Sequence, residues 1–186
     1  MTRPDRKDPD LPAYATSPRP KRVKRVRLAV LVASFAACLS VTLIGIVFMS
    51  MMKFALNLFG ETPAMFGHSS VLGGVELALQ LSSMNFFLFF ITVPAAGLAL
   101  GLSIGRLPHR GITALAPYLR WGAIWGAILV GGTTFAVGLL SAAAAAAGAL
   151  ITGLGIGGLA GAFCGFLVHR IIAPPRQLAE MDVSAF

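Results

Sequence analysis

Soft metal ligands gather between the first long apolar stretch of the chain and the second. They are four methionines and one histidine: Met49, Met51, Met52, Met65 and His68. Thioether and imidazole groups suit Cu(I), so copper handling at the outer face is one hypothesis for this segment. Methionine is also a common filler of apolar surfaces, and MSMMKFALNLF fits the end of a membrane span or an interfacial helix equally well. We predict no resident metal or cofactor, and copper handling stays open as an alternative.

Glycines recur at four-residue spacing in three stretches of the sequence. The three sets are Gly97, Gly101 and Gly105; Gly122 and Gly126; and Gly153, Gly157, Gly161 and Gly165. Residues four apart share one face of a helix, and a face without side chains lets another backbone approach closely, as in a glycine zipper. We expect these faces to pack helices together, either within one four-helix bundle or against a second copy or a larger membrane protein.

Groups that support catalysis are missing from the interior of the apolar stretches. Gly153, Gly155 and Gly158 match the G-x-G-x-x-G pattern of dinucleotide-binding folds. That pattern requires a preceding strand and a loop open to water, whereas here it lies inside an uncharged apolar run. Proton-coupled transport and intramembrane hydrolysis depend on ionisable groups inside the membrane, and the interiors of these stretches have none. The sequence therefore predicts a protein that is not an enzyme.

The elements that position these residues are predicted to be membrane-spanning helices. Of the 186 residues, 56% are hydrophobic and 12% are charged, whereas a soluble domain has about 25% charged residues. A helix of about 20 residues crosses the hydrocarbon core of a bilayer. The run from 121 to 168 has no charged residue, so it must form two spans, with a turn expected at 141–148. Pro94 is expected to kink the second span.

The predicted fold is an all-α integral membrane protein with four transmembrane helices arranged as two hairpins. The expected boundaries are a basic tail at 1–27, a transmembrane domain at 28–172 with spans at 28–50, 81–104, 119–140 and 149–170, an outer loop at 51–80, and a short tail at 173–186.

Positive charge is concentrated just before the first span. The stretch RPKRVKRVR contains six basic residues: Arg19, Lys21, Arg22, Lys24, Arg25 and Arg27. Such a cluster is attracted to anionic lipid headgroups. Nucleic-acid binding would need stacking aromatic residues among the charges, and the tail offers only Tyr14. With four spans, fourteen of the fifteen Lys and Arg lie on the side of both termini, so both termini are predicted to be cytoplasmic. The Ala/Gly/Arg-rich composition suggests a bacterial inner membrane.

These features predict a non-enzymatic accessory, assembly or interaction component of the membrane. Its expected partners are the lipid bilayer with its anionic headgroups, and either a second copy of the chain or a larger membrane protein. One alternative of a different class is an oligomeric channel or small-solute transporter, with the glycine faces packed around a shared path. The other alternative is copper handling.

Overall fold

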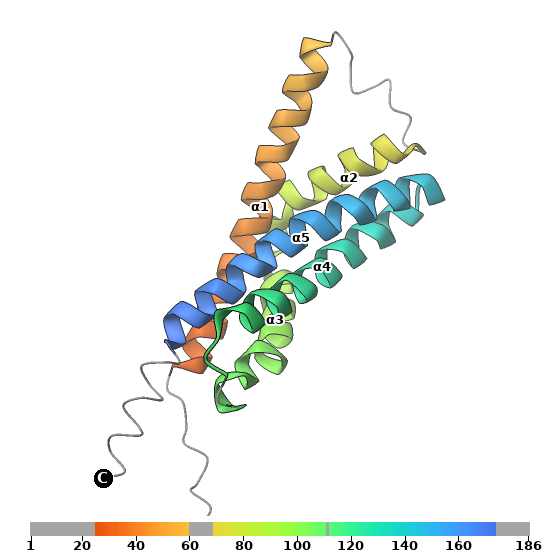
Figure 1. Ribbon diagram of the computed structural model, residues 1–186. Coiled ribbons are helices and arrows are strands. Elements are labelled where there is room, and N and C mark those ends of the chain that lie inside the picture. The colour runs from red at the N-terminus through yellow and green to blue at the C-terminus, as the bar shows by residue number, and fades with distance from the viewer. Residues whose placement is uncertain (1–24, 60–68, 111, 174–186) are drawn as a thin grey trace, which may run out of the picture.

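Helices form all the regular structure in the described part of the chain. The computed structural model describes residues 25–59, 69–110 and 112–173 (Figure 1). In chain order the elements are α1 (Val26–Leu58), α2 (Val71–Ser83), η3 (Asn85–Leu88), α3 (Phe89–Leu102), η4 (Ile104–Arg106), η5 (Pro108–Arg110), α4 (Leu115–Leu139) and α5 (Ala143–Ile172).

Four segments are long and apolar enough to cross a membrane. They are Val26–Leu58, Asn85–Arg110, Leu115–Leu139 and Ala143–Ile172. Large apolar side chains project outward from them, including Leu43, Phe90 and Ile151, each more than half exposed. Water would penalise so much exposed apolar surface, whereas lipid tails solvate it. The all-α class and the four long apolar helices of the prediction are therefore confirmed, and these helices suggest a multi-pass membrane protein.

The segment 51–80, predicted to be an outer loop, contains helical structure. Helix α1 continues to Leu58, and α2 begins at Val71. The Ser70 side chain caps α2 by accepting a hydrogen bond from the Gly73 backbone N–H at 3.0 Å. Gly74 and its neighbours bury one face of α2 against α5. Residues 60–68 of this segment lie outside the described residues.

The turn between the last two long helices is shorter than predicted. Helix α4 ends at Leu139 and α5 begins at Ala143, whereas the turn was expected to continue to residue 148. Alanine has the highest helix propensity, so the run from Ala143 to Ala147 extends α5 rather than forming a turn.

Both ends of the described chain lie at the same end of the bundle. Val26 of α1 and Ile172 of α5 belong to one apolar cluster that also contains Ile104 and Tyr118 (Figure 1). Tyr118 is fully buried, and its hydroxyl donates a hydrogen bond to the Ile112 carbonyl oxygen at 2.9 Å. We call this end the basic end, because every described arginine lies in an element that begins or ends there: Arg25, Arg27, Arg106, Arg110, Arg120 and Arg170.

Candidate functional site: the groove between α3 and α4

Helices α2 and α3 are separated by an interruption at the start of the second long apolar segment, Asn85–Arg110. Figure 1 shows α2 and α3 following one another across the bundle. In the chain, Met84 and the short helix η3 lie between them. Serine and asparagine side chains compete for backbone hydrogen bonds, which favours an interruption at the sequence Ser-Ser-Met-Asn. The Ser83 hydroxyl, for example, donates to the Gln80 carbonyl oxygen at 2.8 Å. The interruption precedes Pro94, the expected kink position, which lies inside α3.

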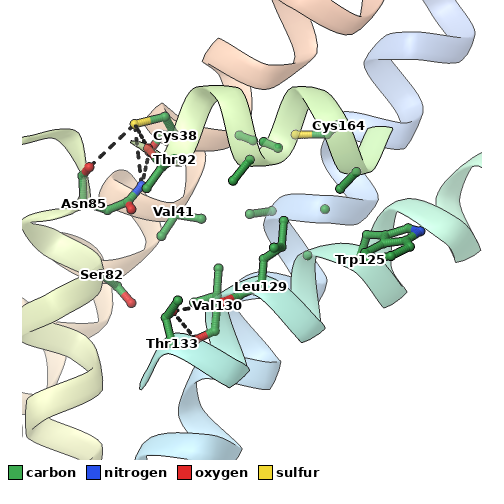
Figure 2. Close-up of a pocket in the computed structure, with 18 of the residues that line it drawn as sticks. Cys38, Val41, Ser82, Asn85, Thr92, Trp125, Leu129, Val130, Thr133 and Cys164 are labelled. Carbon is green, nitrogen blue, oxygen red and sulfur yellow. Dashed lines mark hydrogen bonds between the residues drawn. The ribbon is translucent and has the colours of Figure 1, made fainter. Parts of the chain in front are cut away.

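Hydrogen bonds around Cys38 of α1 hold this interruption in place (Figure 2). The Asn85 side-chain amide donates to the Cys38 carbonyl oxygen at 3.3 Å and to the Cys38 sulfur at 3.5 Å. The Cys38 thiol is 3.7 Å from the Asn85 carbonyl oxygen, and the Thr92 hydroxyl is 3.4 Å from the Cys38 sulfur. A polar side chain inside a membrane needs such partners, since lipid offers none.

An apolar groove of about 280 Å³ lies between α3 and α4, beside the interruption. We call it the α3–α4 groove. Buried residues of α1 and α5 form its floor, among them Ala160, and Ala96 of α3 lines one wall. Figure 2 shows Cys38, Cys164 and Leu129 around it. No Asp, Glu, Lys, Arg or His is among the described residues that line it. Its polar groups are the hydroxyls and amide of Ser82, Asn85, Thr92, Thr133 and Thr134, and the indole of Trp125.

Two buried polar atoms at this groove have no hydrogen-bond partner among the described residues. They are the Ser82 hydroxyl and the indole nitrogen Nε1 of Trp125. Ser82 lies at the end of α2, beside the interruption, and Trp125 lies in the basic-end half of α4. Because buried polar atoms in native proteins nearly always have partners, each of these atoms calls for an explanation.

A second pocket, of about 290 Å³, adjoins the groove at the basic end. We call it the basic pocket. It is lined by Leu102, Ser103, Arg106, Leu107, Arg110, Trp121 and Trp125. Trp125 lines both hollows, so they adjoin at its side chain. The space between α3 and α4 therefore has a cationic, aromatic end and an apolar end.

The predicted glycine faces of the last two long helices lie against each other. A methyl group added at Gly122 would overlap the Gly161 carbonyl oxygen, and one added at Gly126 would overlap the Gly157 carbonyl oxygen. A methyl group at Gly165 would overlap the Tyr118 carbonyl oxygen. The backbones of α4 and α5 are thus in direct contact, and these glycine faces are covered by their own chain.

The remaining predicted glycines also face other helices of the same chain. Gly153 lies against the Thr134 hydroxyl, which donates a hydrogen bond to the Ala149 carbonyl oxygen at 2.8 Å. On α3, Gly97 and Gly101 face Ser34 and Val30 of α1, and Gly105, in η4, faces Val26 and Val30. A second copy or a protein partner would therefore have to use another surface.

Sequence reasoning missed the groove and two of the close contacts. Neither Asn85 nor Trp125 was singled out as a candidate binding residue. The available signal was a lone side-chain amide in an otherwise apolar run. The close contacts between α2 and α5 were missed because they are made by Gly74 and Gly148, which fell in predicted loop and turn; each lies against a backbone carbonyl of the partner helix.

The methionines of the copper hypothesis do not share one face of α1. Met49 and Met52 pack beside a buried apolar cluster that contains Val41 and Leu79, whereas Met51 is exposed. Met65 and His68 lie outside the described residues, so the copper site stays a prediction. Within the described ranges, no three His, Cys, Asp or Glu side chains gather in a way that could hold a metal ion.

The predicted headgroup-binding cluster falls mostly outside the described residues. Arg25 and Arg27 are exposed at the start of α1. Arg19, Lys21, Arg22 and Lys24 lie before the first described residue.

Comparisons with family models, with curated proteins and with solved structures found no significant match.

Proposed function

We propose that the protein is a non-enzymatic interaction component of a membrane that accommodates an apolar guest in the α3–α4 groove. The observation that carries the proposal is the open groove itself, which remains between α3 and α4 although α4 and α5 are in direct backbone contact. A bacterial inner membrane with both termini in the cytoplasm belongs to the same proposal. The gathering of arginines at the basic end supports this orientation, because Lys and Arg are retained on the cytoplasmic side.

The interrupted helix supports a binding role for the groove. Irregular backbone at membrane depth is tolerated where it is buried in protein or lines a cavity, and in transporters interrupted helices form binding sites near the bilayer midplane. The interruption at Met84 and η3 lies beside the groove, and Asn85 and Leu88 belong to both. A volume of about 280 Å³ is close to the lower limit of known small-molecule sites, about 300 Å³.

The lining favours binding over catalysis. Its walls are mostly aliphatic, and its polar side chains are hydroxyls, an amide and an indole. Such groups orient a guest by hydrogen bonding, and they supply neither a general base near neutral pH nor a metal site. The two cysteines at the floor are buried, and Cys164 is 3.4 Å from the Ala33 carbonyl oxygen, within its own bundle.

Native mass spectrometry of the protein released from mild detergent tests this proposal. Ala96 lines the groove, and Leu98 lies on the same helix with its side chain exposed. We expect the unchanged protein and Leu98→Phe to retain a bound guest, and Ala96→Phe to lose it because the phenyl ring fills the groove. The same bound mass in all three proteins, or no bound mass in the unchanged protein, would overturn the proposal.

A second candidate function, small-solute transport, is favoured by the interrupted helix alone. Flux measurements in proteoliposomes distinguish the two functions. Transport predicts flux in the unchanged protein and in Leu98→Phe, and its loss in Ala96→Phe. The guest-binding proposal predicts no solute flux above that of empty liposomes in any of the three.

A further inference from the structure

We propose that the guest is an anionic phospholipid, with its phosphate in the basic pocket and one acyl chain in the α3–α4 groove. This inference rests on the proposed function and names its ligand. It starts from Trp125, which lines both hollows and whose Nε1 is buried without a partner in the described part of the protein. In Figure 2 the ring nitrogen of Trp125 lies on the side of the indole that is turned away from Leu129.

The basic pocket has the charge that a phosphate requires. Arg106 and Arg110 line it, and guanidinium groups bind phosphate oxygens through paired N–H donors. The single acidic residue in the described ranges is Glu76, on α2, so no described carboxylate lies on the elements that form the pocket. Trp121 adds an aromatic ring of the kind enriched at headgroup depth.

The order of chemistry along the groove matches the order of groups in a phospholipid. From the basic end come two guanidinium groups, then the Trp125 N–H, then a mostly aliphatic groove as far as Val137. A phospholipid presents a phosphate, then ester oxygens that accept a hydrogen bond, then a hydrocarbon chain. Along α4 the distance from Trp125 to Val137 is about 18 Å, close to the roughly 15 Å of hydrocarbon in one leaflet.

These dimensions and charges favour a lipid over a transmembrane helix as the occupant. A helix with its side chains is about 10 Å wide, which a groove of about 280 Å³ does not admit along this length. An apolar helix would also leave both arginines and the Trp125 N–H without anionic or accepting partners. An anionic phospholipid supplies both.

Fluorescence quenching by brominated lipids tests the inference. Bromine on an acyl chain quenches indole fluorescence on contact, and both tryptophans of the chain line the basic pocket. The protein is reconstituted in phosphatidylcholine vesicles that contain a small, equal fraction of either brominated phosphatidylglycerol or brominated phosphatidylcholine. We expect the anionic lipid to occupy the site in roughly tenfold preference, as expected for one to two basic side chains near a headgroup.

Arginine variants test which side chains cause the preference for the anionic lipid. Replacing both pocket arginines, Arg106→Gln with Arg110→Gln, is expected to abolish it, while the corresponding lysine pair keeps most of it and shows that the pair can be changed without unfolding. Arg170→Gln is the matched control, because Arg170 is also at the basic end, with its guanidinium carbon 5.6 Å from the Phe166 ring centre, and lines neither hollow. An equal loss of preference in Arg170→Gln would overturn the inference.

The remaining outcomes separate a lipid from free phosphate and separate this inference from the proposed function. If millimolar inorganic phosphate removes the preference, the site binds small anions and the phospholipid inference is wrong. Equal quenching by both lipids that Ala96→Phe weakens means that a chain occupies the groove without headgroup selectivity, so only this inference fails. If both lipids quench equally and Ala96→Phe does not change the quenching, the quenching comes from bulk lipid. Both proposals are then wrong.

Discussion

Helix α4 meets its two neighbours in opposite ways. Toward α5 it presents Gly122 and Gly126, and the two backbones touch. Toward α3 it presents Trp125 and Leu129, and a groove remains between the helices. Lipid gives little hydrophobic drive for helices to associate, so close backbone contact through small residues largely decides which pairs close. Large side chains hold α3 and α4 apart, and the space between them is then available to something other than protein.

The largest expected effect is on the contact between α4 and α5. Gly161→Leu forces a side chain against the Gly122 backbone, so we expect it to destabilise the protein by about 3 kcal/mol or more, which lowers the melting temperature in detergent by roughly 6–12 °C. Gly158→Leu is the matched control, because a side chain there meets nothing within 4 Å. Equal melting shifts for the two variants would contradict backbone contact between α4 and α5.

A smaller effect is expected from removing the hydrogen bond that links α4 and α5. Thr134→Val removes a buried hydroxyl that is 2.8 Å from the Ala149 carbonyl oxygen, and we expect a loss of about 1 kcal/mol in the free energy of unfolding. Thr133→Val serves as the control, since that hydroxyl bonds within its own helix, to Leu129 and Val130. The account is wrong on this point if Thr133→Val is the more damaging change.

At the α3–α4 groove, removing the indole N–H of Trp125 should affect lipid binding rather than folding. Trp125→Phe deletes a donor that has no partner among the described residues, so the melting temperature of the delipidated protein should not fall by more than a few degrees. Retention of phosphatidylglycerol in native mass spectra should drop by about fivefold, as expected for one lost hydrogen bond. Unchanged retention would remove Trp125 from the proposed site.

The smallest effect on stability is expected from filling the groove. Ala96→Phe adds a ring to open space, so we expect the free energy of unfolding to change by about 0.5 kcal/mol or less, although the guest is lost. A melting shift comparable to that of Gly161→Leu would mean that α3 and α4 are packed as tightly as α4 and α5.

Length and charge predicted the membrane class because the thickness of the hydrocarbon core sets the length of a span, and its low polarity excludes charged side chains. The same reasoning assigned most of α2 to an outer loop, because the contact of Gly74 with the Ala145 backbone of α5 depends on tertiary packing and is not visible in hydropathy. It also missed the interruption at Met84 and η3. Phe86 and Phe87 are as favourable in lipid on an irregular segment as on a helix, so hydropathy does not distinguish the two.

The groove itself was not predictable from the sequence, because it depends on which helices pack directly against each other. Four-residue glycine spacing identified helix faces able to approach closely, and the structure places Gly126 against Gly157. The spacing did not say which pairs would meet. Gly126 contacts Gly157 and also lines the groove, together with Leu129 three residues later, so the contact surface and the groove lining adjoin on α4.

The most direct test is an electron density map of the protein in an anionic lipid bilayer. The account predicts elongated density between α3 and α4, running from Arg106 past Trp125 toward Thr133, with the α4 and α5 backbones in contact. A map in which α3 and α4 pack directly against each other, with no density between them, would contradict it.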